Sequence, residues 1–130
     1  MERRNFVLAM ASALIGMVFA KRTIAEEERK TMYGRVGKMT AVAGQRDALI
    51  SILLAGTTAM PGCLSYVIAK DPANANAIWI TEVWDSEGSH KASLTLPAVK
   101  DAIARGRPLI AGFDQNVVTE PVGGVGLSAR

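Results

Sequence analysis

The sequence predicts a small two-layer α+β domain from about Tyr33 onward, behind a short N-terminal segment of different character. Three observations support this. Four short stretches alternate between polar and apolar residues, as half-buried strands do. Two stretches carry apolar residues at helical spacing, and clusters of glycine and proline separate the segments. The resulting order, strand–helix–strand–strand–helix–strand, is typical of a sheet with helices on one face.

Composition limits what the chain can be. Its 130 residues allow one domain, and 49% hydrophobic with 21% charged residues is typical of a globular protein. The net charge is only +3, and no basic stripe interleaved with aromatic residues occurs, so we expect no nucleic-acid partner. Cys63 is the single cysteine and His90 the single histidine, which excludes an internal disulfide and makes a zinc site unexpected.

The first 20 residues have the three parts of an export signal. Arg3 and Arg4 precede an uncharged apolar run from Phe6 to Ala20, which ends in small residues and is shorter than the about 20 residues of a bilayer span. The Arg-Arg-x-Phe order resembles a twin-arginine signal, although Glu2 stands where Ser or Thr is usual.

This N-terminal segment predicts that the protein is exported to the periplasm. A retained membrane anchor and an additional helix are the alternatives, and we expect a membrane contact only if residues 1–20 are kept. Residues 21–32 are polar and include three consecutive glutamates, so we interpret them as a linker. Residues 33–130 then form the domain.

In the first half of the domain, a strand is predicted over Tyr33–Val42, with Arg35, Gly37 and Met39 on one face and Val36 and Lys38 on the other. A helix is predicted over 45–55 because its apolar residues fall on one stripe. The strands predicted over 63–70 and 77–84 are joined by a short polar loop, so we expect an antiparallel hairpin.

In the second half, Ser86 is a good N-cap for a short helix over 86–94. Pro97 interrupts it and suits the first turn of a second helical piece, to about residue 104. Residues 105–112 are expected to form a turn because they contain Pro108, and the fourth strand is predicted over 114–121.

Helices on one side of four strands leave the other sheet face uncovered. That face would carry about half of the strand side chains, several of them apolar, and an apolar patch of this size is unfavourable in water. We therefore expect a homodimer in which two such faces pack together.

Three stretches in this order carry a resemblance to a known family: MPGCLSY at 60–66, WITEVW at 79–84 followed by His90, and RPLIAGF at 107–113. Over about residues 33–123 the chain resembles the antibiotic biosynthesis monooxygenase family, and most of all its quinol-monooxygenase-like branch. The resemblance implies a ferredoxin-like fold, a dimeric α/β barrel, and oxygenation of a phenol, quinol or similar small molecule by O2 without a flavin, metal or other cofactor. A deprotonated substrate of this kind donates an electron to O2 by itself, so the protein has to bind it, take its proton and shield the intermediate.

The same resemblance implies that Trp84, at a strand end, and His90, on the following helix, line the cavity as catalytic residues. His90 can take a phenolic proton because its ordinary pKa is about 6.5. Tyr66, Glu82 and Arg107 are the expected substrate-binding residues. Each has a plain structural alternative: a packed histidine or tryptophan, a cross-strand aromatic at Tyr66, or an ion pair of Glu82 with Arg105 or Arg107.

One departure matters. Family members that oxygenate polycyclic phenols carry an asparagine about four residues before the tryptophan, where this chain has Ile80. Asn74 and Asn76 precede the strand and are poor substitutes. Three functions therefore stay open: a cofactor-independent monooxygenase, a non-catalytic or isomerising small-molecule-binding dimer, and an assembly dimer with a filled core.

Overall fold

The structure is a computed structural model and describes residues 31–127. The predicted export segment and most of the predicted linker lie outside the described residues. None of the helices among residues 31–127 is long and apolar enough to cross a membrane.

The described part of the chain alternates strands and helices in the predicted order. Its elements are β1 (Tyr33–Ala41), α2 (Arg46–Gly56), β2 (Cys63–Lys70), β3 (Ala77–Trp84), α3 (Glu87–Ser93), α4 (Pro97–Gly106), the single-turn 3-10 helix η1 (Arg107–Leu109) and β4 (Ile110–Thr119). The Ser86 N-cap is confirmed, because its hydroxyl accepts a hydrogen bond from the Ser89 amide at 3.1 Å. Pro97 begins α4, where its missing N–H costs nothing.

The four strands form one antiparallel sheet in the order β2-β3-β1-β4. The hairpin of β2 and β3 is present, and β1 lies between β3 and β4 as the sheet's second central strand. This is the ferredoxin-like α+β arrangement that the sequence predicts.

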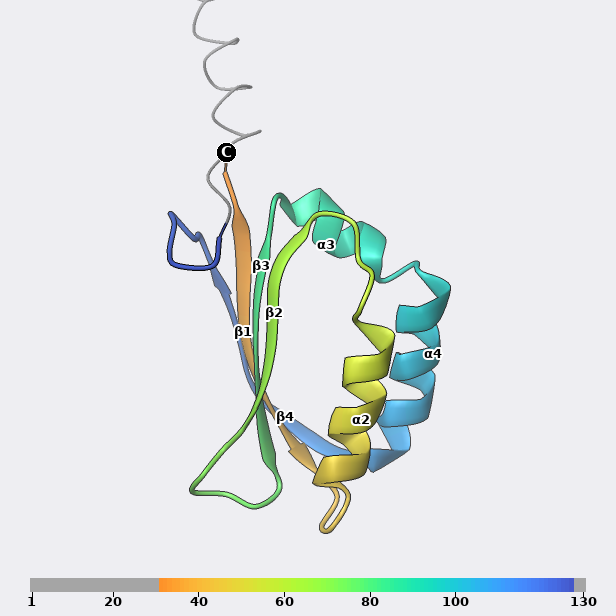
Figure 1. Ribbon diagram of the computed structural model, residues 1–130. Coiled ribbons are helices and arrows are strands. Elements are labelled where there is room, and N and C mark those ends of the chain that lie inside the picture. Colours follow the sequence, from red (N-terminus) through yellow and green to blue (C-terminus); the bar gives the residue numbers. More distant parts are fainter. Residues whose placement is uncertain (1–30, 128–130) are drawn as a thin grey trace, which may run out of the picture. The chain divides into compact units, whose positions relative to one another are not determined.

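The helices among residues 31–127 cover one face of the sheet, and the other face carries none of the described elements (Figure 1). The core lies between α2 and the sheet, where Ala41, Leu49, Ile78 and Ile80 are buried together. Ile78 and Ile80 belong to the helix-facing side of β3, so Glu82 and Trp84 point to the same side. Sheet alternation therefore directs both predicted site residues of β3 toward the helices.

The fourth strand begins earlier than the sequence predicts. Residues 107–109 form η1, and β4 starts at Ile110, not at Asp114. Pro108 fits the tight turn of η1 because its fixed φ and missing N–H are tolerated there. The Leu109 carbonyl accepts a hydrogen bond from the Val42 amide at 2.8 Å, so the chain enters the sheet directly from that turn.

A β-bulge interrupts the pairing of β4 with β1. Phe113 pairs with Met39 and Gln115 with Lys38, so Asp114 is the additional residue. The bulge shifts the alternation of the strand and brings Phe113 and Asn116 to the helix-facing side, although they are three positions apart. Asp114 instead accepts a hydrogen bond from the Thr40 hydroxyl at 2.6 Å.

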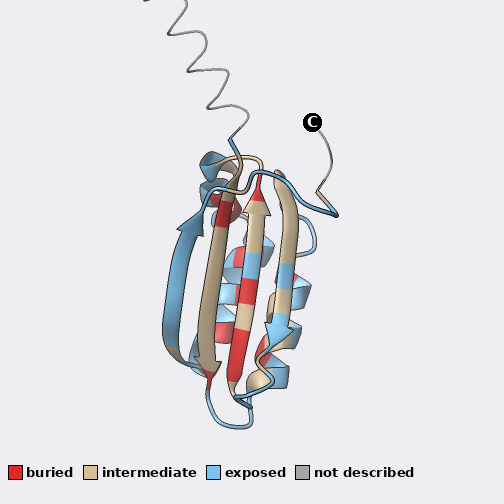
Figure 2. Cartoon of the chain, turned by 90° about the vertical axis from the view of Figure 1, so that its left-hand side faces the viewer, coloured by how far each residue is buried: buried red, intermediate tan, exposed pale blue. Residues whose placement is uncertain are grey.

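Figure 2 looks onto the sheet face that the helices leave uncovered. We call this the open face. Val67 and Val117 on it are 53% and 51% exposed, and the Trp79 ring lies there beneath Lys38, whose ammonium nitrogen is 5.2 Å from the ring centroid. Asp71 accepts the Trp79 indole N–H at 3.0 Å and pairs with Lys38 at 3.7 Å.

Candidate active site

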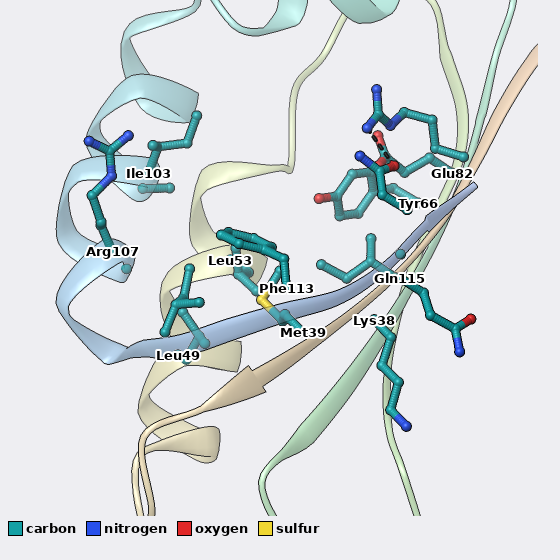
Figure 3. Close-up of a pocket in the computed structure, with 17 residues that line it drawn as sticks. Lys38, Met39, Leu49, Leu53, Tyr66, Glu82, Ile103, Arg107, Phe113 and Gln115 are labelled. Atoms are coloured by element: carbon teal, nitrogen blue, oxygen red, sulfur yellow. Dashed lines mark hydrogen bonds between the residues drawn. The ribbon is translucent and has the colours of Figure 1, made fainter. Parts of the chain in front are cut away.

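A pocket of about 430 Å³ lies between the sheet and the helices. An engineered apolar cavity of about 150 Å³ holds benzene, so this volume suits roughly two or three fused rings. Most of its wall is apolar, with side chains from β1, α2, β3, α4 and β4: Met39, Leu49, Leu53, Ile80, Ile103, Ile110 and Phe113. Figure 3 shows Phe113 and Met39 between the two ends of the pocket.

One end of the pocket is polar, and the strand register builds it. Tyr66 on β2 pairs with Glu82 on β3, and Glu82 pairs with Arg35 on β1. Paired residues share a sheet face, so a phenol, a carboxylate and a guanidinium form one row across three strands. All three line the pocket. We call this set the polar row (Figure 3 labels Tyr66 and Glu82).

Beside the polar row, Gly37 leaves the floor of the pocket open. A Cβ atom at Gly37 would meet nothing nearer than the Gln115 carbonyl oxygen, at 3.8 Å. Asn116 pairs with Gly37 on the neighbouring strand and also lines the pocket. Its side-chain oxygen accepts a hydrogen bond from the Arg35 guanidinium at 2.6 Å.

Glu82 is held from behind by two aromatic rings. The Trp84 indole N–H donates to Glu82 Oε1 at 3.0 Å, and His90 Nε2 lies 4.0 Å from the same oxygen. The rings of Trp84 and His90 meet edge to face with centroids 5.5 Å apart. Tyr33, which pairs with Trp84 in the sheet, also contacts His90, with ring centroids 5.4 Å apart.

Burial sets the protonation of two of these groups. It lowers the pKa of His90 below its ordinary value; Glu82 opposes this shift and the positive charge of Arg35 adds to it. The imidazole is therefore neutral near pH 7 and makes no ion pair with Glu82. Burial, followed by the Glu82 charge, raises the pKa of Tyr66 far above its usual range, so Tyr66 stays a hydrogen-bond donor.

The predicted site residues thus fall into two groups. Tyr66, Glu82 and Arg107 line the pocket, with Arg107 contributed by η1. Trp84 and His90 are buried behind Glu82 and are absent from the pocket lining. Trp84 and His90 therefore adjoin the pocket only through Glu82, which both rings lie against.

The ion pair considered for Glu82 does not form. Arg105 pairs with Asp101 on its own helix at 3.6 Å, and Arg107 makes no ion pair with Glu82. Ile80, at the position where an asparagine is expected, is 7% exposed and belongs to the core as well as to the pocket wall. Glu82 therefore faces the pocket with its carboxylate bonded to the Trp84 N–H and next to the His90 ring.

Sequence reasoning missed Arg35 and Asn116 as pocket residues. Arg35 shares a predicted strand face with Gly37 and Met39, but alternation alone does not say which face the helices cover. Asn116 reaches the pocket only because of the bulge at Asp114. Among residues 31–127, no group of three or more His, Cys, Asp and Glu side chains is placed to hold a metal ion.

Comparisons with known proteins place this chain in a family. The family model for antibiotic biosynthesis monooxygenase matches residues 32–105. A candidate antibiotic biosynthesis monooxygenase from Chloroflexus aurantiacus J-10-fl is 66% identical, with a TM-score of 0.73, over 75% of this chain and 99% of that chain. No curated protein gave a significant match.

More distant structures share the fold. A candidate antibiotic biosynthesis monooxygenase from Caulobacter crescentus CB15 is 18% identical, with a TM-score of 0.62, over 76% of this chain and 95% of that one. A variant of SnoaB, a cofactor-independent oxygenase from Streptomyces nogalater, is 14% identical, with a TM-score of 0.61, over 72% of this chain and 96% of that one. The family match over residues 32–105 and the 66% identical Chloroflexus relative show that the chain belongs to the antibiotic biosynthesis monooxygenase family.

Proposed function

We propose that the protein is a cofactor-independent monooxygenase that oxidises a quinol- or phenol-like small molecule with O2. The observation that carries the proposal is the pocket itself. It offers apolar walls of a size suited to fused aromatic rings, and it ends in a phenol donor and a carboxylate. Family membership supports the reaction class.

The overall reaction balances without an external reductant. A hydroquinone and O2 give a hydroxyquinone and water, so one oxygen atom enters the ring and the other is reduced to water. The substrate supplies all four electrons. The chain's contribution is to position the ring, remove the hydroxyl proton and keep water away from the reactive intermediate.

In this proposal Glu82 takes the proton directly, because it lines the pocket and His90 does not. Trp84 orients the carboxylate through its N–H. Neutral His90, whose Nε2 lies 4.0 Å from Glu82 Oε1, packs edge to face on Trp84 and helps to position the carboxylate, and the proton passes from Glu82 to solvent. Tyr66 donates a hydrogen bond to a substrate oxygen, and Arg107 contacts the substrate from the η1 side of the pocket.

A non-catalytic binding protein of the same fold is the second candidate. Two observations favour it: Ile80 stands where family oxygenases carry an asparagine, and Trp84 and His90 do not reach the pocket. The open pocket argues against the third option, an assembly dimer with a filled core.

O2 uptake with a panel of quinols and naphthols separates the two candidates. We expect uptake by the wild type, a loss of at least about 100-fold in Glu82→Gln, as is usual for a removed general base, and a smaller loss in His90→Ala. Glu87→Gln is the matched control, because Glu87 is a carboxylate on α3 that pairs with Lys91 outside the pocket. Binding without uptake for every substrate would favour the second candidate, and equal uptake by wild type and His90→Ala would remove His90 from the mechanism.

We further propose that the protein is a homodimer joined through the open face. The half-exposed valines and the Trp79 ring support this, because they form an apolar surface on a sheet without covering helices. Export to the periplasm remains our proposal from the sequence of residues 1–20, with a membrane anchor as the alternative.

A further inference from the structure

The charge of Arg35 is not neutralised within the described chain. Its guanidinium donates to the Asn116 side-chain oxygen at 2.6 Å and to the Tyr33 hydroxyl at 3.4 Å, and both acceptors are neutral. No carboxylate among residues 31–127 forms an ion pair with it, although Glu82 stands opposite it in the sheet. The lowered pKa of His90, for which burial is the main cause, also reflects this unpaired positive charge.

A half-buried guanidinium normally has an anionic partner, because taking a charge out of water without one is costly. Arg35 instead lines the pocket, in the same row as the Tyr66 donor. Asn116 and Tyr33 hold its guanidinium in place, so it does not need to reorganise when an anion arrives. The site is therefore arranged to receive a negative charge from a ligand.

We propose that Arg35 binds the oxyanion of the substrate, so that the pocket takes up phenolates in preference to neutral phenols. This inference rests on the proposed function and adds the ionisation state of its substrate. Tyr66 and Arg35 would donate hydrogen bonds to the same oxygen, and the proton that the hydroxyl loses would pass to Glu82 and on to solvent. A charged donor strengthens such a bond, which lets the ring ionise before it meets O2.

Other titratable groups adjoin this end of the pocket, and their charges also influence whether phenolate or phenol binds more tightly. They are Glu82 on β3, Tyr66 on β2, Tyr33 on β1 and His90 on α3. Arg107 on η1 and Lys38 on β1 also line the pocket, but their side chains lie away from Tyr66 and Glu82 (Figure 3). Tyr66 and His90 are neutral near pH 7. Glu82 is the one anion of this set and opposes phenolate binding. Of the three cations that line the pocket, Lys38 is paired with Asp71 at 3.7 Å, so the cation that favours phenolate binding is Arg35 or Arg107.

A nitrophenol tests the inference without any oxygen chemistry, because only its phenolate absorbs visible light and its electron-poor ring resists O2. Absorbance of the protein-bound probe is titrated against pH and compared with the free probe. We expect the bound probe to ionise at least about one pH unit lower, which means that phenolate binds at least about tenfold more tightly than phenol. Failure of the wild type to bind the probe, or binding without a shift, would overturn the inference.

Variants assign the effect to Arg35. We expect Arg35→Gln to abolish the shift, and Arg35→Lys to retain part of it, because it keeps the charge but loses the planar fork. Arg105→Gln is the matched control, since Arg105 is exposed and pairs with Asp101 outside the pocket. It should leave the shift unchanged, whereas Arg107→Gln should reduce it less than Arg35→Gln.

A second variant keeps the test decisive if Arg35→Gln folds poorly. Asn116→Asp leaves the Arg35 side chain in place but sets a carboxylate against it, on an exposed strand position. It should cancel the shift by neutralising the guanidinium. A shift that persists in both Arg35→Gln and Asn116→Asp contradicts the inference.

The outcomes distinguish this inference from the proposed function. O2 uptake with a quinol, together with an unshifted nitrophenol, would leave the monooxygenase proposal standing and overturn the role of Arg35. A clear shift without O2 uptake on any substrate would support phenolate binding and contradict the proposed reaction.

Discussion

Gly37 forms the floor of the pocket, and a side chain placed there should block ligand binding without harming the fold. We take Gly37→Val as the perturbation. A Cβ at this position meets only the Gln115 carbonyl oxygen, at 3.8 Å, and the backbone is not in the left-handed region. Replacing a strand glycine by a β-branched residue at such a site should stabilise the protein by about 0.5–1 kcal/mol.

The expected loss of ligand affinity follows from the geometry of the pocket. The isopropyl group would stand beside the polar row and displace the ring from the floor. If roughly 60 Å² of apolar contact is lost, at about 25 cal/mol per Å² the cost is about 1.5 kcal/mol, or roughly tenfold in affinity. Steric overlap with a ligand of three fused rings would add to this.

Gly112→Val is the matched control. Gly112 also lies within a strand, near the start of β4, a Cβ there meets nothing within 4 Å, and it does not line the pocket. Urea denaturation should show a similar gain in stability for both variants, while calorimetric titration with a naphthol shows weaker binding only for Gly37→Val. Unchanged affinity in Gly37→Val would refute the placement of the ligand in this pocket.

Three further predictions test the surroundings of the pocket. Trp84→Phe should lower the free energy of unfolding by about 2 kcal/mol, because it removes a partly buried hydrogen bond to a carboxylate from a ring that is 1% exposed. Trp79→Phe removes a similar bond on the open face and should cost less; urea denaturation of both variants measures the difference. Because burial lowers the pKa of His90, folding favours its neutral form. The contribution of this group to stability is therefore complete above about pH 6.5 and is lost as the pH falls through the lower native pKa. His90→Gln should flatten that part of the plot of unfolding free energy against pH, and an unchanged plot would show that His90 is not the cause. Val67→Glu on the open face should convert the proposed dimer to a monomer, as measured by light scattering. Leu54→Glu, at a similarly exposed position on α2, should leave the dimer intact. A wild type that is already monomeric contradicts the proposed assembly.

The sequence predicted the element order well because the signals are local. Alternation placed Ile80, Glu82 and Trp84 on one face of β3, and Ser86 and Pro97 marked helix starts that the structure contains. The uncovered sheet face followed from the same order. These features depend on spacing and capping within a few residues, which a single sequence shows directly.

The candidate site was predictable only in part, because it depends on contacts between distant residues. The bulge at Asp114 exists only in the pairing of β4 with β1, and it brings Asn116 to Arg35 across 81 positions of the sequence. The resemblance suggested that Trp84 and His90 line the cavity, but their mutual packing places them behind Glu82. Side-chain packing decided this, and spacing along the chain does not reveal it.

The start of β4 was mispredicted for a related reason. Pro108 was interpreted as a turn that separates the last helix from a strand at Asp114, whereas the single turn of η1 already ends at Leu109. Residues 110–113 then join the sheet, which adds Ile110 and Phe113 to the pocket wall. Proline excludes a helix interior but does not fix how soon the next strand begins.

Isotope labelling tests the central claim, oxygenation in this pocket, most directly. The reaction is run with ¹⁸O-labelled O2 and a quinol that the wild type consumes, and the quinone product is analysed by mass spectrometry. We predict one labelled oxygen atom in the product and one in water. The rate of incorporation at a quinol concentration below saturation should fall in Glu82→Gln and in Gly37→Val, and should be retained in Glu87→Gln and Gly112→Val. An unlabelled product accompanied by hydrogen peroxide, or the same labelling rate without protein, would contradict the account.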